Sequence, residues 1–290
     1  LWIGRDGKRQ AIAAPEGAYR DVRLSPDAAR LAARRGTAAS SDIWVLEFAR
    51  NAWTRFTFDP KGDKLPVWSP DGRQIAFSSD RSGYLQIYRK DSSGAGQEEQ
   101  LTSGPSYKYL EDWSRDGRYL LYVQYSVGGA LNLWTVPLDG ERKPMPVFPS
   151  PFTEAAGRFS PNGRWIAYGS DESNKNEVYI QAFPGAPSAP KGKWQVSVQG
   201  GTSPVWRGDG KELFFLAPGG KMMAAGVRET ASGLEIDTPR ELFSTAATPN
   251  PTTPYDVTAD GQRFLVHEPT AGANDNPLTV IVNWQAGLKN

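Results

Sequence analysis

The chain has 290 residues, 39% of them hydrophobic, and its 33 basic and 32 acidic residues leave a formal net charge of +1. This composition excludes wholesale disorder, and it lacks the basic excess by which nucleic-acid-binding proteins neutralise phosphates. There is no cysteine, which excludes disulfides, thiolate metal sites and cysteine nucleophiles.

No apolar stretch approaches the roughly 18 residues that a membrane helix needs, so we expect no membrane insertion of this segment. The first residue is Leu1, with neither a starting methionine nor a signal-peptide pattern after it. We therefore expect a fragment or a processed product. We also expect a monomer that binds no nucleic acid.

A short motif recurs six times, and each copy places Asp or Asn three residues after an apolar residue. The copies are Leu24–Asp27, Trp68–Gly72, Trp113–Gly117, Phe159–Gly163, Trp206–Gly210 and Val257–Gly261. Apolar and other residues alternate on both sides of each copy, which is typical of two strands joined by an Asp-Gly hairpin turn. Ala28 replaces glycine in the first copy, so we expect that turn to be the least favourable.

Two further strands follow each hairpin. The third strands are expected around Ile43–Val45, Gln86–Tyr88, Leu133–Thr135, Val178–Ile180, Met222–Ala224 and Val280–Val282. Four short strands in about 45 residues are typical of one propeller blade, whereas a β-sandwich, the alternative, does not require six copies of one motif. We predict an all-β fold, a single six-bladed β-propeller over residues 1–290, with blades at about 14–58, 59–104, 105–150, 151–199, 200–246, and 247–290 plus 1–13.

The two ends of the chain are expected to close the ring. The sixth repeat has no fourth strand of its own, and Arg9–Ile12 can supply one. Closing the ring in this way removes an open sheet edge. Both Leu1–Ile3 and Thr279–Val282 are candidates for the third strand of this blade, and we expect the C-terminal segment to take the place.

The Ser-Pro-Asp-Gly-Arg hairpin, followed by an apolar strand and Ser-Asp, resembles the TolB-type propeller repeat, a WD-like repeat family. The best copies are Trp68–Asp80 and Phe159–Asp171. The chain more narrowly resembles propellers at the C-terminal end of membrane-anchored bacterial serine/threonine kinases and their free-standing relatives. The matching stretches are Asp42–Val45, Arg55–Pro60, Asp171–Ser173, Pro204–Trp206 and Val282–Leu288.

This resemblance implies a ligand-binding, protein-binding or sensing module without catalysis of its own. It also implies an extracytoplasmic location, in the periplasm or at the cell surface. Kinase activity is not carried over, because the chain has neither a glycine-rich phosphate loop nor a His-Arg-Asp stretch. The chain also lacks a Gly-x-Ser-x-Gly nucleophile elbow, so similarity to prolyl peptidase propellers implies no peptidase activity.

The segments that lead into the first strands are rich in charged and aromatic residues, and propellers commonly bind ligands at a channel mouth. We expect a protein or small-molecule ligand there. The candidate ligand-binding residues are Tyr19, Asp21, Arg23, Tyr109, Glu111, Asp112, Arg158, Tyr255 and Asp256. Because blades one and six are neighbours, as are blades three and four, we expect Arg23 to pair with Asp256 and Arg158 with Asp112 near the axis.

A metal-dependent hydrolase of the lactonase or phosphotriesterase kind is the alternative, with a divalent ion such as Ca²⁺ in the channel. The candidate ligands are Asp21, Asp63, Glu111, Asp112, Glu154 and Asp256. They belong to no spacing motif that specifies a metal, so we predict no cofactor for the main function. His267 is the only histidine; we expect it at a surface or blade edge, without a catalytic role.

Overall fold

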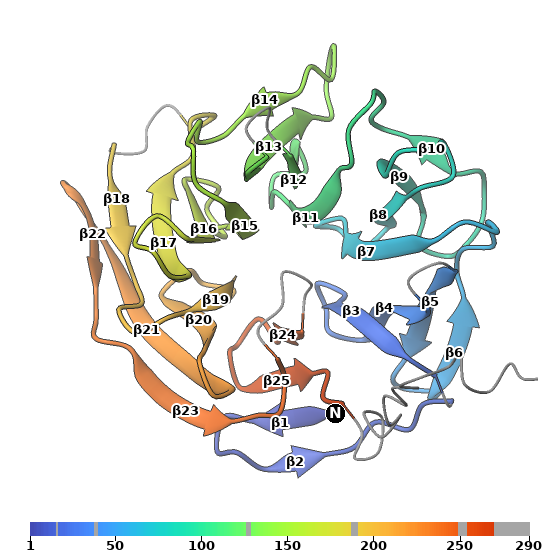
Figure 1. The fold of residues 1–290 in the computed structure, drawn as a ribbon. Coiled ribbons are helices and arrows are strands. Elements are labelled where there is room, and N and C mark those ends of the chain that lie inside the picture. Colours follow the sequence, from blue (N-terminus) through green and yellow to red (C-terminus); the bar gives the residue numbers. More distant parts are fainter. Residues whose placement is uncertain (16, 38–39, 126–128, 187–190, 249–253, 270–290) are drawn as a thin grey trace, which may run out of the picture.

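The computed structural model describes residues 1–269 except 16, 38–39, 126–128, 187–190 and 249–253. The strands form six antiparallel sheets that stand around a central axis like the blades of a propeller (Figure 1). No helix occurs within these described ranges. The predicted all-β, six-bladed fold is confirmed.

Each blade runs from an inner strand at the axis to an outer strand at the rim. The first strands are β3 (Tyr19–Leu24), β7 (Asp63–Trp68), β11 (Tyr109–Trp113), β15 (Glu154–Phe159), β19 (Thr202–Trp206) and β24 (Tyr255–Val257). The second strands are β4 (Arg30–Gly36), β8 (Gln74–Ser79), β12 (Tyr119–Tyr125), β16 (Trp165–Ser170), β20 (Glu212–Ala217) and β25 (Arg263–Val266).

The outer half of each blade consists of its third strand and a shorter fourth strand. The third strands are β5 (Ser41–Glu47), β9 (Gln86–Asp91), β13 (Leu131–Pro137), β17 (Glu177–Ala182), β21 (Lys221–Thr230) and β1 (Trp2–Gly4). The fourth strands are β6 (Ala52–Arg55), β10 (Glu99–Gln100), β14 (Met145–Pro146), β18 (Lys193–Gln195), β23 (Arg240–Ser244) and β2 (Arg9–Gln10). In blade five, β22 (Gly233–Ile236) extends the end of β21 as an additional hairpin.

The antiparallel order divides the connections between two faces of the ring. We call the side with the turns between first and second strands the hairpin face. We call the opposite side the crossover face, because it carries the connections from second to third strands and from each blade to the next.

The hairpin turns are held by a repeated set of side-chain hydrogen bonds. In blade two, the Ser69 hydroxyl donates to Asp71 Oδ1 at 2.6 Å and accepts from Gln74 N at 2.9 Å, while Asp71 Oδ1 also accepts from Arg73 N. The same bonds recur in blades one, three, four and six. They satisfy backbone donors that the turn leaves out of the ladder, so the motif specifies the turn locally.

The two N-terminal strands complete the sixth blade. β1 pairs with β25 in the register Trp2↔Leu265 and Ile3↔Phe264, and β2 pairs with β1. At the end of this ladder, Leu1 and Val266 exchange two backbone hydrogen bonds of 2.9 and 3.1 Å. The prediction that the N-terminus closes the ring is confirmed.

The expectation that Thr279–Val282 forms the third strand of this blade is wrong, because β1 occupies that place. The physical reason is that β1 and β2 form one hairpin, closed by Gly4 N donating to Lys8 O at 2.7 Å. Strand β1 carries two apolar side chains, Trp2 and Ile3, which are buried against the neighbouring blades. Thr279–Val282 itself lies outside the described residues.

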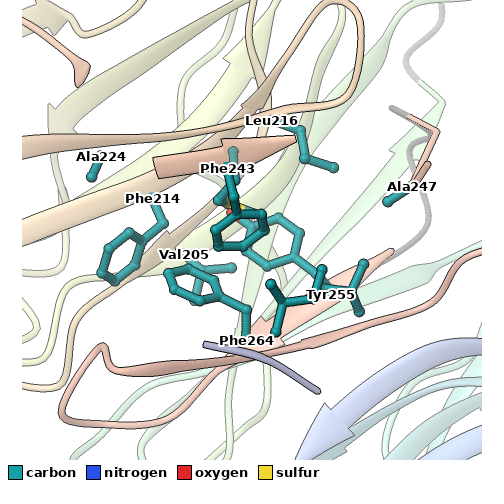
Figure 2. Packing of buried hydrophobic residues seen from close by; sticks show 11 residues of the cluster. Val205, Phe214, Leu216, Ala224, Phe243, Ala247, Tyr255 and Phe264 are labelled. Atoms are coloured by element: carbon teal, nitrogen blue, oxygen red, sulfur yellow. The ribbon is translucent and has the colours of Figure 1, made fainter. Parts of the chain in front are cut away.

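Apolar side chains fill the space between adjacent blades. Figure 2 shows the cluster between blades five and six, where the Phe264 ring lies edge-on at 5.0 Å from both Phe214 and Phe243. Ile3 from the N-terminal strand belongs to the same cluster and is fully buried. The closing hairpin is therefore part of the core.

Removal of residues 1–13 should open the ring and expose the edge of β25, so we expect loss of cooperative folding or aggregation of the truncated chain. Ile3→Ala should give a graded effect, lowering the free energy of unfolding by about 2–4 kcal/mol through a core cavity. Lys8→Ala, at an exposed position, is the control. Denaturant titration checks all three, and a truncated chain as stable as the intact one would contradict this closure.

Ala28 should be a local source of instability, because its φ of 54° lies in the left-handed region, where the equivalent glycines have φ of 69–76°. Ala28→Gly should raise the free energy of unfolding by about 1 kcal/mol, because the Cβ penalty disappears. Ala29→Gly is the matched control and should lower stability. Equal effects of the two substitutions in thermal unfolding would show that the turn is unstrained.

Candidate functional site

All six blades contribute one side chain to a pocket on the axis. The residues four positions before each repeated Asp or Asn line it, namely Arg23, Val67, Asp112, Arg158, Val205 and Asp256. The pocket has a volume of about 120 Å³ and is also bounded by hairpin-turn residues such as Pro26, Pro70 and Pro161. It therefore lies at the hairpin face, at the other end of the channel from the segments that lead into the first strands.

A β-bulge directs these side chains. In five of the six first strands, the register of pairing with the second strand shifts just before the axial residue. In β3, for example, the shift lies between Arg20 and Arg23. Four of these bulges hold a non-glycine residue in the left-handed region, with φ of 53–57°: Asp21, Leu65, Ala156 and Ser203. A bulge turns the strand locally and re-aims the following side chain.

The axial residues follow the order Arg-Val-Asp twice around the ring, so blades that face each other across the axis carry the same residue. The contacts repeat as well. Leu24 N donates to Asp256 Oδ2 and Phe159 N donates to Asp112 Oδ2, each at 2.8 Å. The axial pocket thus has an approximate twofold symmetry within one chain.

These contacts differ from the two predicted ion pairs. Within the described residues, Asp112 and Asp256 form no ion pair with Arg158 and Arg23, because each carboxylate already accepts a backbone N–H from the next blade. Both guanidinium groups donate instead to the backbone carbonyl of Glu111. Glu111 is the bulged residue of β11, so its backbone lies outside the ladder and its carbonyl is available.

The other predicted ligand-binding residues do not line this pocket. Tyr255 is fully buried in the core between blades five and six and donates to Ser203 O at 2.7 Å. Tyr19 packs against Trp53, with ring centroids 4.9 Å apart, and donates to Pro15 O. Tyr109 packs partly buried against the cluster between blades three and four. Asp21 and Glu111 are buried residues of the inner strands β3 and β11.

The six predicted metal ligands are likewise not brought together. Asp21 pairs with Arg34 at 3.0 Å and Asp63 with Arg81 at 3.0 Å. Burial raises the pKa of both carboxyl groups. Among the residues that the structure describes, no three histidine or acidic side chains gather closely enough to hold a metal ion.

Two buried glutamates titrate near neutrality. Burial raises the pKa of Glu111 to about 7, against the opposing effect of Arg158 and Arg23. Burial also raises the pKa of Glu154 to about 7, and its Oε2 atom has no hydrogen-bond partner. His267 is half-buried, and its burial lowers the pKa of the imidazole.

Exposed apolar side chains collect on the opposite side of the ring. Seven large apolar side chains are exposed among the described residues, and six of them lie in loops or at strand ends of the crossover face: Phe58, Tyr84, Tyr107, Tyr125, Phe152 and Val198. We call these six residues the aromatic rim. None of the six is among the candidate ligand-binding residues predicted from the sequence, because single loop residues carry no repeat signal.

The crossover face is also hollowed. A pocket of about 490 Å³ lies where blades four and five meet, and its wall includes Leu131, Lys175, Leu216 and Pro218. Gly200, Gly201 and Thr202, at the start of β19, also line it.

The raised pKa values predict a pH-dependent stability. With a pKa of about 7 in the folded chain, Glu154 keeps a proton that it loses in the unfolded chain above pH 4.5. The contribution of Glu154 to the free energy of unfolding should therefore fall as pH rises from 4.5 to 7 and then level off. Glu154→Gln should remove about 2–3 kcal/mol of this fall, while leaving stability at pH 5 near that of the original chain.

Glu141→Gln, at an exposed position, is the control and should keep the original profile. The fall that remains in Glu154→Gln should come from the other buried carboxyl groups with raised pKa values, those of Glu111, Asp21 and Asp63. Urea unfolding at pH 5 and pH 8 measures the difference. An unchanged pH dependence in Glu154→Gln would show that this carboxyl titrates normally.

Similarity to known proteins supports the fold assignment. A solved structure described as a putative TolB from Agrobacterium tumefaciens has a TM-score of 0.69 at 17% identity, over 91% of this chain and 95% of that one. TolB from Acinetobacter baumannii has a TM-score of 0.59 at 16% identity, over 87% of this chain and 64% of that one.

Curated relatives match over shorter stretches. An uncharacterized peptidase of Bacillus subtilis is 38% identical over 90 residues, which is 31% of this chain and 13% of the relative. An uncharacterized protein of Agrobacterium fabrum is 36% identical over 73 residues, 25% of this chain and 24% of the relative. This chain thus spans less than a quarter of the length of either relative.

The narrower resemblance to kinase-linked propellers stays a prediction, and one of its stretches, Val282–Leu288, lies outside the described residues. Within the described ranges, the structure holds no helix with the length and apolar character that crossing a bilayer requires. The model of the TolB β-propeller domain family matches residues 4–188, more than half of the chain. The chain therefore belongs to the TolB β-propeller domain family.

Proposed function

We propose that this chain is a protein-binding module without catalysis of its own, and that it holds its partner on the crossover face. The observation that carries this proposal is the aromatic rim. Exposed apolar side chains gathered on one face of a fold are typical of interaction sites, and tyrosine and phenylalanine are enriched in them.

The extent of the aromatic rim favours a protein over a small ligand. Its residues come from the loops of blades one to five, so a partner that contacts them all spans most of the ring. Tyr84 and Tyr107 come from different connections, yet their rings meet edge to face with centroids 5.4 Å apart. Such a preformed aromatic pair loses little side-chain entropy when a partner covers it.

The pocket between blades four and five gives the surface an anchoring point. Its wall combines apolar side chains, Leu131, Leu216 and Pro218, with the amine of Lys175 at one side. A partner can insert one apolar side chain there while the aromatic rim covers the surrounding surface. Anchors of this kind commonly contribute most of the affinity of an interface.

Two further points support binding over catalysis. Of the six acidic residues required for the alternative, a metal-dependent hydrolase, only Asp112 and Asp256 share the axial pocket. Four of the six are held by an arginine or by backbone N–H groups of the next blade. Similarity to the peptidase from Bacillus subtilis covers only 13% of that protein, which is consistent with a shared propeller segment. We also propose a location outside the cytoplasm, which the family relationship to TolB propellers supports.

The triple variant Tyr84→Ser, Tyr107→Ser, Phe152→Ser should weaken partner binding at least about tenfold, because it removes apolar contact area from the centre of the surface. Since all three side chains are exposed, thermal unfolding should change little. Met145→Ser is the matched control: Met145 is as exposed as Tyr107, at 44%, but lies on the outer strand β14.

The partner can be identified by photo-crosslinking in cells from position 125, with position 145 as the comparison. Binding of the purified partner is then measured by calorimetry with the original chain and both variants. Equal affinity for the triple variant and the original chain would overturn the proposal. So would sedimentation that shows the chain itself dimerising through this face.

A further inference from the structure

The axial pocket at the hairpin face contains two like charges held close together. Arg23 and Arg158 come from β3 and β15, which stand across the axis from each other (Figure 1). Each residue is only 7% exposed. Because both guanidinium groups donate to the one carbonyl of Glu111, they meet at the axis.

The two arginines lack the acceptors that buried guanidinium groups normally have. Arg23 donates to Glu111 O, while Arg158 donates to Glu111 O and at 3.3 Å to Gly157 O. The Nε atoms of both are buried without a hydrogen-bond partner. A guanidinium group carries more N–H donors than these contacts use, and unpaired buried donors cost free energy.

The nearest acidic side chains do not remove this excess of donors. Asp112 and Asp256 line the same pocket, but the Oδ2 atom of each is engaged by the backbone N–H of the next blade. Among the described residues, neither arginine forms an ion pair within 4.0 Å. The carboxyl group of Glu111, with its pKa raised by burial to about 7, supplies only part of a negative charge at neutral pH.

The charges that line the pocket favour a single negative charge as the missing component. The guanidinium groups of Arg23 and Arg158 are buried in the pocket beside Asp112 and Asp256, and the exposed Arg115 adds a third positively charged residue to the lining. One positive charge is left over. Consistent with this crowding of cations, burial and then the charge of Arg158 lower the pKa of Arg23 to about 10.

We propose that Arg23 and Arg158 bind the carboxylate group of a monoanionic ligand at the axis of the hairpin face. The planar guanidinium fork matches the two oxygens of a carboxylate. The volume of about 120 Å³ accommodates a carboxylate with a short apolar segment beside Val67 and Val205. A dianion such as phosphate is disfavoured by the two aspartates in the wall.

This site is separate from the aromatic rim, which lies on the crossover face, so either proposal can fail without the other. A small-molecule acid and the C-terminal carboxylate of a peptide share the same chemistry. Hairpin-turn residues, including Pro26, Pro70 and Pro161, also line the axial pocket. Because these turn residues lie at the hairpin face, a ligand longer than a simple acid can extend outward from a carboxylate bound in the pocket.

Calorimetry with propionate, with chloride matching the ionic strength, tests the proposal. We expect saturable millimolar binding, and weaker binding of inorganic phosphate. Arg23→Lys and Arg158→Lys keep the charge but lose the fork, and each should weaken propionate binding at least about tenfold. Arg73→Lys is the matched control, because Arg73 lies exposed on the same face and does not line the pocket.

Binding of acetyl-Ala-Ala-Ala, measured as the free acid and as the C-terminal amide, distinguishes a peptide C-terminus from a small-molecule acid as the ligand. Tighter binding of the free acid than of propionate identifies a peptide C-terminus, and equal binding identifies small acids. Should either lysine variant unfold, Val205→Phe fills the pocket with both arginines retained and should also abolish binding. Phosphate binding as tightly as propionate, no saturable binding at all, or unchanged affinity in the folded pocket variants would overturn the proposal.

Discussion

Closure of the ring is the constraint on which the rest of the structure depends. Each blade buries its apolar side chains against its neighbours, so a ring with one incomplete blade leaves two unpaired surfaces at once. The N-terminal hairpin β1–β2 resolves this by pairing with β25 and by placing Ile3 in the core between blades five and six. Residues more than 260 positions apart, Leu1 and Val266, thus exchange backbone hydrogen bonds.

Closure also explains how the two faces acquire different properties. In five of the six blades, a hydroxyl residue and an Asp or Asn two positions later hold the hairpin turn by the same hydrogen bonds, and this face presents charges at the axis. The crossover connections are under no such common restraint. They vary in length and carry the exposed apolar side chains of the aromatic rim. The repeat therefore supplies a scaffold, while sequence variation is concentrated where partners can reach it.

The candidate sites could be predicted from the sequence only in part. The register of the repeat correctly placed Arg23, Asp112, Arg158 and Asp256 at the axis. It could not predict their partners, because the bulge in β11 frees the Glu111 carbonyl and the aspartates bind backbone N–H groups of the next blade. Tyr255 was predicted to contact a ligand but is buried in the core between blades five and six. The sequence near a loop does not show whether an aromatic side chain points into the core or towards solvent.

The sequence by itself determined the number of blades, the hairpin turns and the family, because these depend on local hydrogen bonds and a repeated apolar pattern. Only the tertiary structure decided that Leu1–Ile3 closes the ring, since the apolar pattern of the sequence made both Leu1–Ile3 and Thr279–Val282 suitable as strands. It alone also brought Arg23 and Arg158 together across the axis, and Tyr84 beside Tyr107. Contacts between blades depend on the geometry of the closed ring, which no single repeat encodes.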